Sequence, residues 1–281
     1  MEHSLLAIYA HPDDEAFGTG GTISCYATEG VKTYLVCATR GEVGEISDPS
    51  LATPENLGQV REGELRCAAE TMGISELIFL DYRDSGMAGT PENQDPRAFI
   101  NADPDRVTGQ LVKIIRTYQP QVIVTFDPFG GYGHPDHIFI HHRATEAFHA
   151  AGDATRYPEA GAPYQPQKLY WAVFPKRLIK FFVLVMRLTR RDPTKFGRNG
   201  DIDLIDIAAH DYPATTRINV RAYYKIKQAA SRCHVSQFSD GPMRYSTLQK
   251  WLAAYETFRL VEPSPNGKRL KERDLFEGIT V

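Results

Sequence analysis

The 281-residue chain lacks the features that mark nucleic-acid-binding, membrane-spanning and secreted proteins. Its formal net charge is −3 and its pI is near 6.3. The chain therefore lacks the excess of positive charge that is typical of nucleic-acid-binding proteins. No stretch approaches the roughly 20 consecutive apolar residues that a membrane-spanning helix needs. A secretory signal carries a basic region ahead of its apolar run, and this N-terminus has none. We therefore expect a cytoplasmic protein with no nucleic-acid partner and no membrane span.

Cysteine is scarce and scattered. The four cysteines, Cys25, Cys37, Cys67 and Cys233, show no short paired spacing. Thiolate zinc sites and small disulfide-rich folds usually do show such spacings. The sequence therefore predicts buried free thiols, and neither a disulfide framework nor a cysteine metal site.

Short apolar runs alternate with longer segments of helical periodicity through the first 175 residues. Strands are expected at 5–10, 31–39, 76–82, 121–127 and 168–174, and helices at 17–29, 54–72, 105–118 and 137–150. This alternation is typical of a mainly parallel sheet with helices on both faces. We predict an α/β, Rossmann-like doubly wound fold with strand order 3-2-1-4-5.

The pattern changes after Phe174. A basic, apolar helix opens the segment 176–210, and further helices are expected at 221–235 and 245–259. Because no linker separates these parts, we expect one domain over 1–281, with a catalytic core at 1–175 and a C-terminal elaboration at 176–281. The basic helix at 176–191 is expected to form a lid or an oligomer contact rather than to lie on a membrane. A homo-oligomer is left open.

Two clusters of histidines and acids stand after predicted strands. AHPDDE (10–15) follows the first strand, and GGYGHPDH (130–137) follows the fourth. In a doubly wound sheet these strands are neighbours where the winding reverses, and ligands bind at their carboxyl ends. The two clusters should therefore face each other across one crevice.

The residue types in these clusters suit a hydrolytic metal centre. Two imidazoles and one carboxylate are the composition of a catalytic zinc site, although iron(II) accepts the same set. The spacing of His11 and Asp14 can direct both at one ion. Asp13, between them, should then project towards the attacking water and accept its proton.

The second cluster offers groups for the other side of the scissile bond. We expect His134 to face that side, with Asp136 orienting its ring. Tyr132, on a glycine-flanked loop, is placed to donate a hydrogen bond to the developing oxyanion. The remaining isolated histidines show no acidic partner pattern and receive no role: His3, His149, His210 and His234.

AHPDDE and the later GHPDH together resemble the LmbE-like (PIG-L-like) de-N-acetylases, the superfamily of N-acetylglucosaminylphosphatidylinositol deacetylase. The resemblance runs from Leu5 to about Phe174. RGEVGE (40–45), VREGELRCAAETMGI (60–74) and YRDSGMAG (82–89) are similar in particular to the mycothiol-pathway deacetylases and the mycothiol-conjugate amidase.

The resemblance implies a role for each matching residue. Zinc would lie on His11, Asp14 and His137, with Asp13 as general base. His134 would stabilise or protonate the tetrahedral intermediate, and Asp136 would tune it. Tyr132 would lie over the carbonyl. The positions of Arg61 and Asp84 match residues that hold sugar or inositol hydroxyls.

The expected function is therefore metal-dependent removal of an N-acetyl or other acyl group from an N-acetylglucosamine-type conjugate. A mycothiol-conjugate amidase is the alternative enzyme, and the expected partner in either case is a small amino-sugar conjugate. A nucleotide-binding or sugar-binding Rossmann protein is the non-catalytic rival. GTGGT (18–22) does not fit the dinucleotide pattern G-x-G-x-x-G, because Ile23 stands at its last position.

Overall fold

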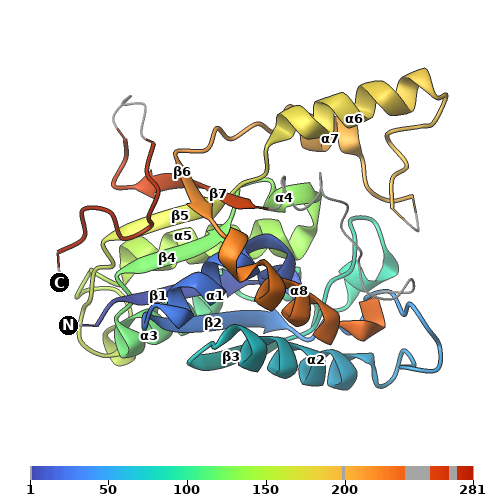
Figure 1. Cartoon of the computed structure of the whole chain (residues 1–281). Helices are drawn as coiled ribbons and strands as arrows, with labels where there is room; N and C mark the ends of the chain where they lie inside the picture. Colours follow the sequence, from blue (N-terminus) through green and yellow to red (C-terminus); the bar gives the residue numbers. More distant parts are fainter. Residues whose placement is uncertain (1, 198–199, 238–253, 266–270, 281) are drawn as a thin grey trace.

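The computed structural model describes residues 2–197, 200–237, 254–265 and 271–280 (Figure 1). Within these ranges the strands form one seven-stranded sheet of order β3-β2-β1-β4-β5-β7-β6. Its strands are β1 (Ser4–Tyr9), β2 (Lys32–Thr39), β3 (Glu76–Tyr82), β4 (Val122–Phe126), β5 (Lys168–Ala172), β6 (Thr216–Asn219) and β7 (Tyr255–Glu262). The first five are parallel, and β7 pairs antiparallel with both β5 and β6. The predicted fold class and the order 3-2-1-4-5 are confirmed.

Helices cover both faces of the parallel part of the sheet. The α-helices of the described residues are α1 (Gly20–Thr28), α2 (Leu57–Met72), α3 (Pro104–Tyr118), α4 (Gly130–Gly133), α5 (Pro135–Ala150), α6 (Lys176–Leu188), α7 (Leu204–Ala209) and α8 (Tyr224–Cys233), of which α1, α2 and α8 lie on one face and α3 and α5 on the other (Figure 1). Leu6 and Ile8 of β1 belong to the core formed with α3 and α5, while Ala7 and Tyr9 belong to the core formed with α1, α2 and α8. Successive side chains of a strand point to opposite faces, which explains why all six residues of β1 are buried.

The pairing of β1 with β4 sets the place of the functional site. Leu5 pairs with Val122 and Ala7 with Val124. The two strands therefore end side by side, with the rings of Tyr9 and Phe126 only 5.0 Å apart. The loops that carry the two histidine–acid clusters leave the sheet from adjacent strand ends, as the switch-point rule predicts.

The C-terminal elaboration differs in part from the prediction. The helix expected at 221–235 is present as α8, preceded and followed by short 3-10 turns. The helix expected at 245–259 is wrong over 254–259, where residue 254 lies in a turn and 255–259 belong to β7, and its part 245–253 lies outside the described residues. In β7, buried Glu256, Phe258 and Leu260 alternate with more exposed residues, which is the period of a strand. The single-domain division stays a prediction.

One cysteine pair also differs from the prediction. Cys67 on α2 and Cys233 on α8 form a disulfide, with Cα atoms 5.8 Å apart, so buried free thiols were the wrong prediction for this pair. The partners are separated by 166 residues in sequence, and only the packing of α8 against α2 brings them together. Cys25 and Cys37 are free and buried, as predicted.

The helices α6 and α7 form an outlying unit, which we call the α6–α7 unit (Figure 1). Val183 and Met186 of α6 pack on Leu204 and Ile207 of α7 in a small apolar cluster separate from the sheet cores. Within the part of the chain that the structure describes, no helix has the length and apolarity to cross a membrane. The expected lid or oligomer role of α6 stays a prediction.

Candidate active site

The two clusters meet at the carboxyl ends of β1 and β4. His11 and Asp14 lie on the loop after β1, and His137 lies in the first turn of α5. His11 Nδ1 is 3.0 Å from His137 Nε2, and Asp14 oxygens lie 3.3 Å from that His137 atom and 3.9 Å from that His11 atom. All three side chains are at least nine-tenths buried. The predicted ligand atoms therefore converge on one small volume.

Hydrogen bonds to the far ring nitrogens fix how the two imidazoles face each other. His137 Nδ1 lies 3.0 Å from the Gly130 carbonyl, and His11 Nε2 lies 3.1 Å from an Asp136 carboxylate oxygen. Carbonyl and carboxylate oxygens only accept, so these ring nitrogens carry the protons. The facing nitrogens of the neutral rings would then both present lone pairs at 3.0 Å. Such an approach needs a cation between them, either a proton or a metal ion.

The surrounding charges also favour a cation beside the two imidazoles. Burial alone lowers the pKa of His11, but Asp84, Asp136 and Asp14 outweigh it and raise that pKa well above its usual value. The cluster thus favours a positive charge at His11. Carboxylate or carbonyl groups on the far nitrogens of metal-binding histidines are the usual supporting arrangement in zinc proteins. The residues present therefore fit a bound metal ion.

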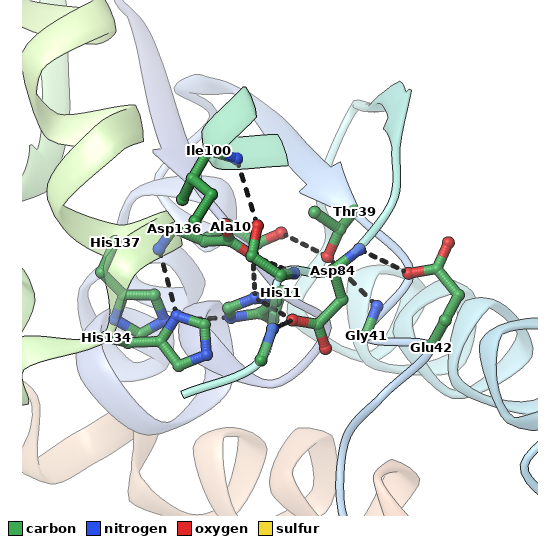
Figure 2. Close-up of polar contacts among 12 residues, drawn as sticks. Ala10, His11, Thr39, Gly41, Glu42, Asp84, Ile100, His134, Asp136 and His137 are labelled. Carbon is green, nitrogen blue, oxygen red and sulfur yellow. Dashed lines mark hydrogen bonds and ion pairs between the residues drawn. The ribbon is translucent and has the colours of Figure 1, made fainter. Parts of the chain in front are cut away.

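More than one metal-binding set can be drawn from these side chains. Within the described residues, His11, His134 and His137 form one compact group, and His11, Asp84 and Asp136 form another. Figure 2 shows that both groups share His11. Asp14 is anchored beside them, because it accepts hydrogen bonds from the backbone N–H groups of His11 (2.8 Å) and Ala10 (3.3 Å).

Asp13 has a different charged partner from Asp14. Its backbone has φ 112°, a left-handed conformation that non-glycine residues rarely adopt. Its Oδ2 accepts a 3.1 Å hydrogen bond from Arg61 Nη2, which also donates to the Pro12 carbonyl. Burial raises the pKa of Asp13 to about 6 against the opposing charge of Arg61. The two consecutive aspartates thus serve different neighbours.

His134 and Asp136 are arranged differently from the expectation. The Asp136 carboxylate contacts His11, and also accepts from the Ser85 N–H, rather than holding the ring of His134. Only the Asp136 backbone reaches His134, by donating to its Nδ1 over 3.2 Å at the N-terminus of α5. The remaining His134 nitrogen, Nε2, therefore carries the proton when the ring is neutral. Burial, and then His11 and His137, lower the pKa of His134 well below its usual value.

The other predicted residues also border the cluster. The Tyr132 ring lies 5.0 Å from the His137 ring and is 37% exposed, so it stands at the solvent side of the site. Asp84 is buried, with Oδ1 3.4 Å from His11 Nε2. Its backbone N–H donates to Glu42 (Figure 2). Arg61 is buried against Asp13. All nine predicted site residues thus come from one neighbourhood.

Two residues without a predicted role join this neighbourhood. Glu15, the last acid of AHPDDE, lies 2.8 Å from His234 Nε2 and accepts a hydrogen bond from the Asp13 N–H. His234 therefore has an acidic partner, contrary to the expectation. Glu15 could have been considered from the sequence, because it is the third acid of the motif AHPDDE. No local pattern marks His234, because its partner stands 219 residues earlier.

The sequence is also similar to those of known deacetylases. A family model described as PIG-L, GlcNAc-PI de-N-acetylase, matches residues 6–148. A Geodermatophilus obscurus protein named 1D-myo-inositol 2-acetamido-2-deoxy-alpha-D-glucopyranoside deacetylase is 37% identical over 98% of this chain and 97% of its own. A Rhodococcus opacus protein of the same name is 40% identical over 99% of each chain.

Among solved structures, the N,N'-diacetylchitobiose deacetylase from Pyrococcus horikoshii matches with TM-score 0.65 and 22% identity. The match covers 99% of this chain and 86% of that one. A 4-carboxy-2-hydroxymuconate hydratase from Pseudomonas putida matches with TM-score 0.58 and 21% identity, over 93% and 97% of the two chains. These likenesses show the fold alone. Since one neighbour is a hydratase, the reaction has to be argued from the side chains and the sequence relatives.

Proposed function

This chain belongs to the PIG-L family of de-N-acetylases, and from that premise we propose that it deacetylates the amino-sugar nitrogen of a GlcNAc–inositol conjugate. The full-length relatives at 37% and 40% identity that carry this activity in their names support the substrate. The observation that carries the chemistry is the pair of imidazole nitrogens that face each other at 3.0 Å beside Asp14.

We assign the metal to His11, Asp14 and His137, and zinc is our proposed ion, with iron(II) as the alternative. Two imidazoles and a carboxylate leave a coordination position open for water or substrate. A zinc ion held there would polarise the amide carbonyl and lower the pKa of water at the site. Asp136 and the Gly130 carbonyl would orient the two histidines through their far ring nitrogens.

Asp13 is our candidate for the general base. Its carboxylate lies outside the ligand group, and Arg61 holds it in place. It would accept the proton of the attacking water as the oxygen bonds to the amide carbon. The nitrogen–carbon bond then breaks, and the amine leaves after gaining a proton.

His134 and Tyr132 are our candidates for the charge that develops on the carbonyl oxygen. The Nδ1 atom of His134 accepts a backbone N–H, so its Nε2–H is left to donate to the oxyanion. The Tyr132 hydroxyl would add a second donor from the solvent side. Arg61 and Asp84 are proposed to bind sugar or inositol hydroxyls. Because they contact Asp13 and His11, they would link substrate binding to the catalytic groups.

The test is a direct assay of the purified protein. Incubation with 1D-myo-inositol 2-acetamido-2-deoxy-α-D-glucopyranoside should release equal amounts of acetate and free amine. A chelator should remove the activity, and added zinc should restore it. N,N'-diacetylchitobiose and the amide of a mycothiol S-conjugate serve as comparison substrates. Metal-replete protein that released no amine from any N-acetylglucosamine conjugate, yet hydrolysed esters or phosphates well, would overturn the proposal.

A further inference from the structure

A buried acid–histidine pair adjoins Asp13 on the loop after β1. Glu15 is 1% exposed, His234 is fully buried, and the distance from Glu15 Oε1 to His234 Nε2 is 2.8 Å. Neither residue belongs to the metal-binding groups of the described chain. A buried charged group is retained only with good partners, and the second oxygen of Glu15 also has one.

That second oxygen, Oε2, accepts a 3.0 Å hydrogen bond from the backbone N–H of Asp13. Asp13 is the residue with φ 112°. A non-glycine residue is strained in such a conformation, which persists only where its surroundings impose it. The turn at Asp13 is useful because it separates the two consecutive carboxylates: Asp14 folds back onto the His11 backbone, and Asp13 reaches Arg61.

The segment that carries His234 is fixed to α2. The disulfide between Cys67 and Cys233 joins the residue before His234 to α2. Glu64 of α2 accepts hydrogen bonds from the Ser236 backbone N–H (2.6 Å) and hydroxyl (2.8 Å). Helix α2 also carries Arg61, three residues before Glu64. One helix therefore reaches Asp13 by two routes, directly through Arg61 and indirectly through His234 and Glu15.

We propose that Glu15 and His234 are positioning residues that hold the Asp13 peptide in its left-handed conformation and so aim its carboxylate at the reacting water. This inference rests on the proposed role of Asp13 as general base. Arg61 fixes the carboxylate end, and Glu15 fixes the peptide end. His234 keeps Glu15 in place by donating its Nε2–H. The C-terminal elaboration thereby contributes to the active site without touching substrate or metal.

The donors and acceptors of His234 and Glu15 determine which variants break each hydrogen bond. Among the described residues the Nδ1 atom of His234 has no hydrogen-bond partner, so only the Nε2–H donor matters for the proposal. Glutamine at position 234 can still donate to Glu15, but alanine cannot. Glutamine at position 15 has a single amide oxygen, so it cannot accept from both the Asp13 N–H and His234 with separate oxygens, as the carboxylate does.

The experiment measures kcat, KM and zinc content for His234→Ala, His234→Gln and Glu15→Gln. We expect His234→Ala and Glu15→Gln to keep zinc and KM while kcat falls about 10- to 100-fold, the scale of a misplaced catalytic group. His234→Gln should recover most of the loss. In an Asp13→Ala background, His234→Ala should have no further effect on kcat, because it acts only through Asp13.

A matched control comes from a buried ion pair far from the site. Lys168 Nζ lies 2.9 Å from Glu272, and both side chains are less than one-tenth exposed. Glu272→Gln should lower the free energy of unfolding but leave kcat unchanged.

Two results would overturn the inference: unchanged kcat in folded, zinc-replete Glu15→Gln and His234→Ala, or a full additional loss from His234→Ala in the Asp13→Ala background. Unchanged kcat in Asp13→Ala itself would instead refute the proposed general base, and the inference with it. Should His234→Ala fail to fold, the comparison of Glu15→Gln with Glu272→Gln still decides.

Discussion

The active-site rim between β1 and β4 and the α6–α7 unit break the usual burial rule in opposite directions. At the rim, histidines and carboxylates are buried: His11 is 6% exposed, His137 1% and Asp136 0%. On α6, apolar side chains face solvent: Phe181 is 65% exposed and Leu188 75%. Buried polar groups and exposed large apolar groups are the two informative exceptions in a folded protein.

The two exceptions differ in how tightly their surroundings hold them. Each rim side chain has partners from several elements, such as Asp136, which contacts His11 of the β1 loop and Ser85 of the loop after β3. The α6–α7 unit is held mainly by one small apolar cluster, which Phe129 of the loop after β4 joins. Substitutions at the rim should therefore abolish a function, whereas substitutions on the outer face of α6 should change an association.

The largest effect should come from removing a metal ligand. His11→Ala, Asp14→Ala and His137→Ala should each lose bound zinc and nearly all deacetylase activity, because each removes one of the three proposed protein ligands. Elemental analysis of the purified variants measures the zinc. His141→Ala is the matched control, since His141 is buried on the same helix but bonds to the Phe126 carbonyl. Stoichiometric zinc in all three ligand variants would disprove the assignment.

The next effect concerns the neighbouring acid. Asp13→Ala should keep its zinc while kcat falls by about 10²–10⁴, the usual contribution of a positioned general base. Single-turnover kinetics on zinc-replete protein measures the chemical step. If Asp13→Ala released the metal and Asp14→Ala retained it, the roles of the two carboxylates would be the reverse of our assignment.

A smaller effect is expected at the substrate-binding candidates. Asp84→Ala should raise KM by about tenfold or more, since a hydrogen bond to a charged group contributes about 1.5–3 kcal/mol, and should lower kcat less. Arg61→Ala should raise KM and also lower kcat, because Arg61 holds Asp13. Steady-state kinetics separates the two patterns. A fall in kcat at constant KM for Asp84→Ala would show that it acts through His11 and binds no hydroxyl.

The contrast between the regions also explains what the sequence could predict. Over residues 1–175, each strand or helix shows its own periodicity, and both histidine–acid motifs directly follow strands. The fold, the strand order and the meeting of the two motifs could therefore be predicted from local patterns. The partner of the Asp136 carboxylate could not, because His134, two residues earlier, was the obvious candidate and the contact to His11 spans 125 residues.

The C-terminal part depends on contacts that no local pattern records. Cys233, His234 and Ser236 each meet a residue that lies more than 160 positions earlier. A histidine without a nearby acid looks unremarkable in sequence, and a cysteine without a nearby cysteine looks like a free thiol. Their contacts form only when α8 packs against α2, so the sequence alone could not predict them.

The smallest effect on the isolated chain should come from the outer face of α6. Phe181, Leu184 and Leu188 are three or four residues apart, so they share one face of the helix, and their exposures are 65%, 53% and 75%. Leu184→Ser should change the free energy of unfolding by less than about 0.5 kcal/mol, as surface substitutions usually do. Val183→Ala, on the face packed against α7, should cost about 1–3 kcal/mol. Chemical denaturation measures both changes.

If α6 forms an oligomer contact, Leu184→Ser should also shift the mass measured by light scattering towards that of the monomer, while Val183→Ala should not. A loss of stability in Leu184→Ser as large as that in Val183→Ala would show instead that this face is packed within the monomer, as a closed lid would be.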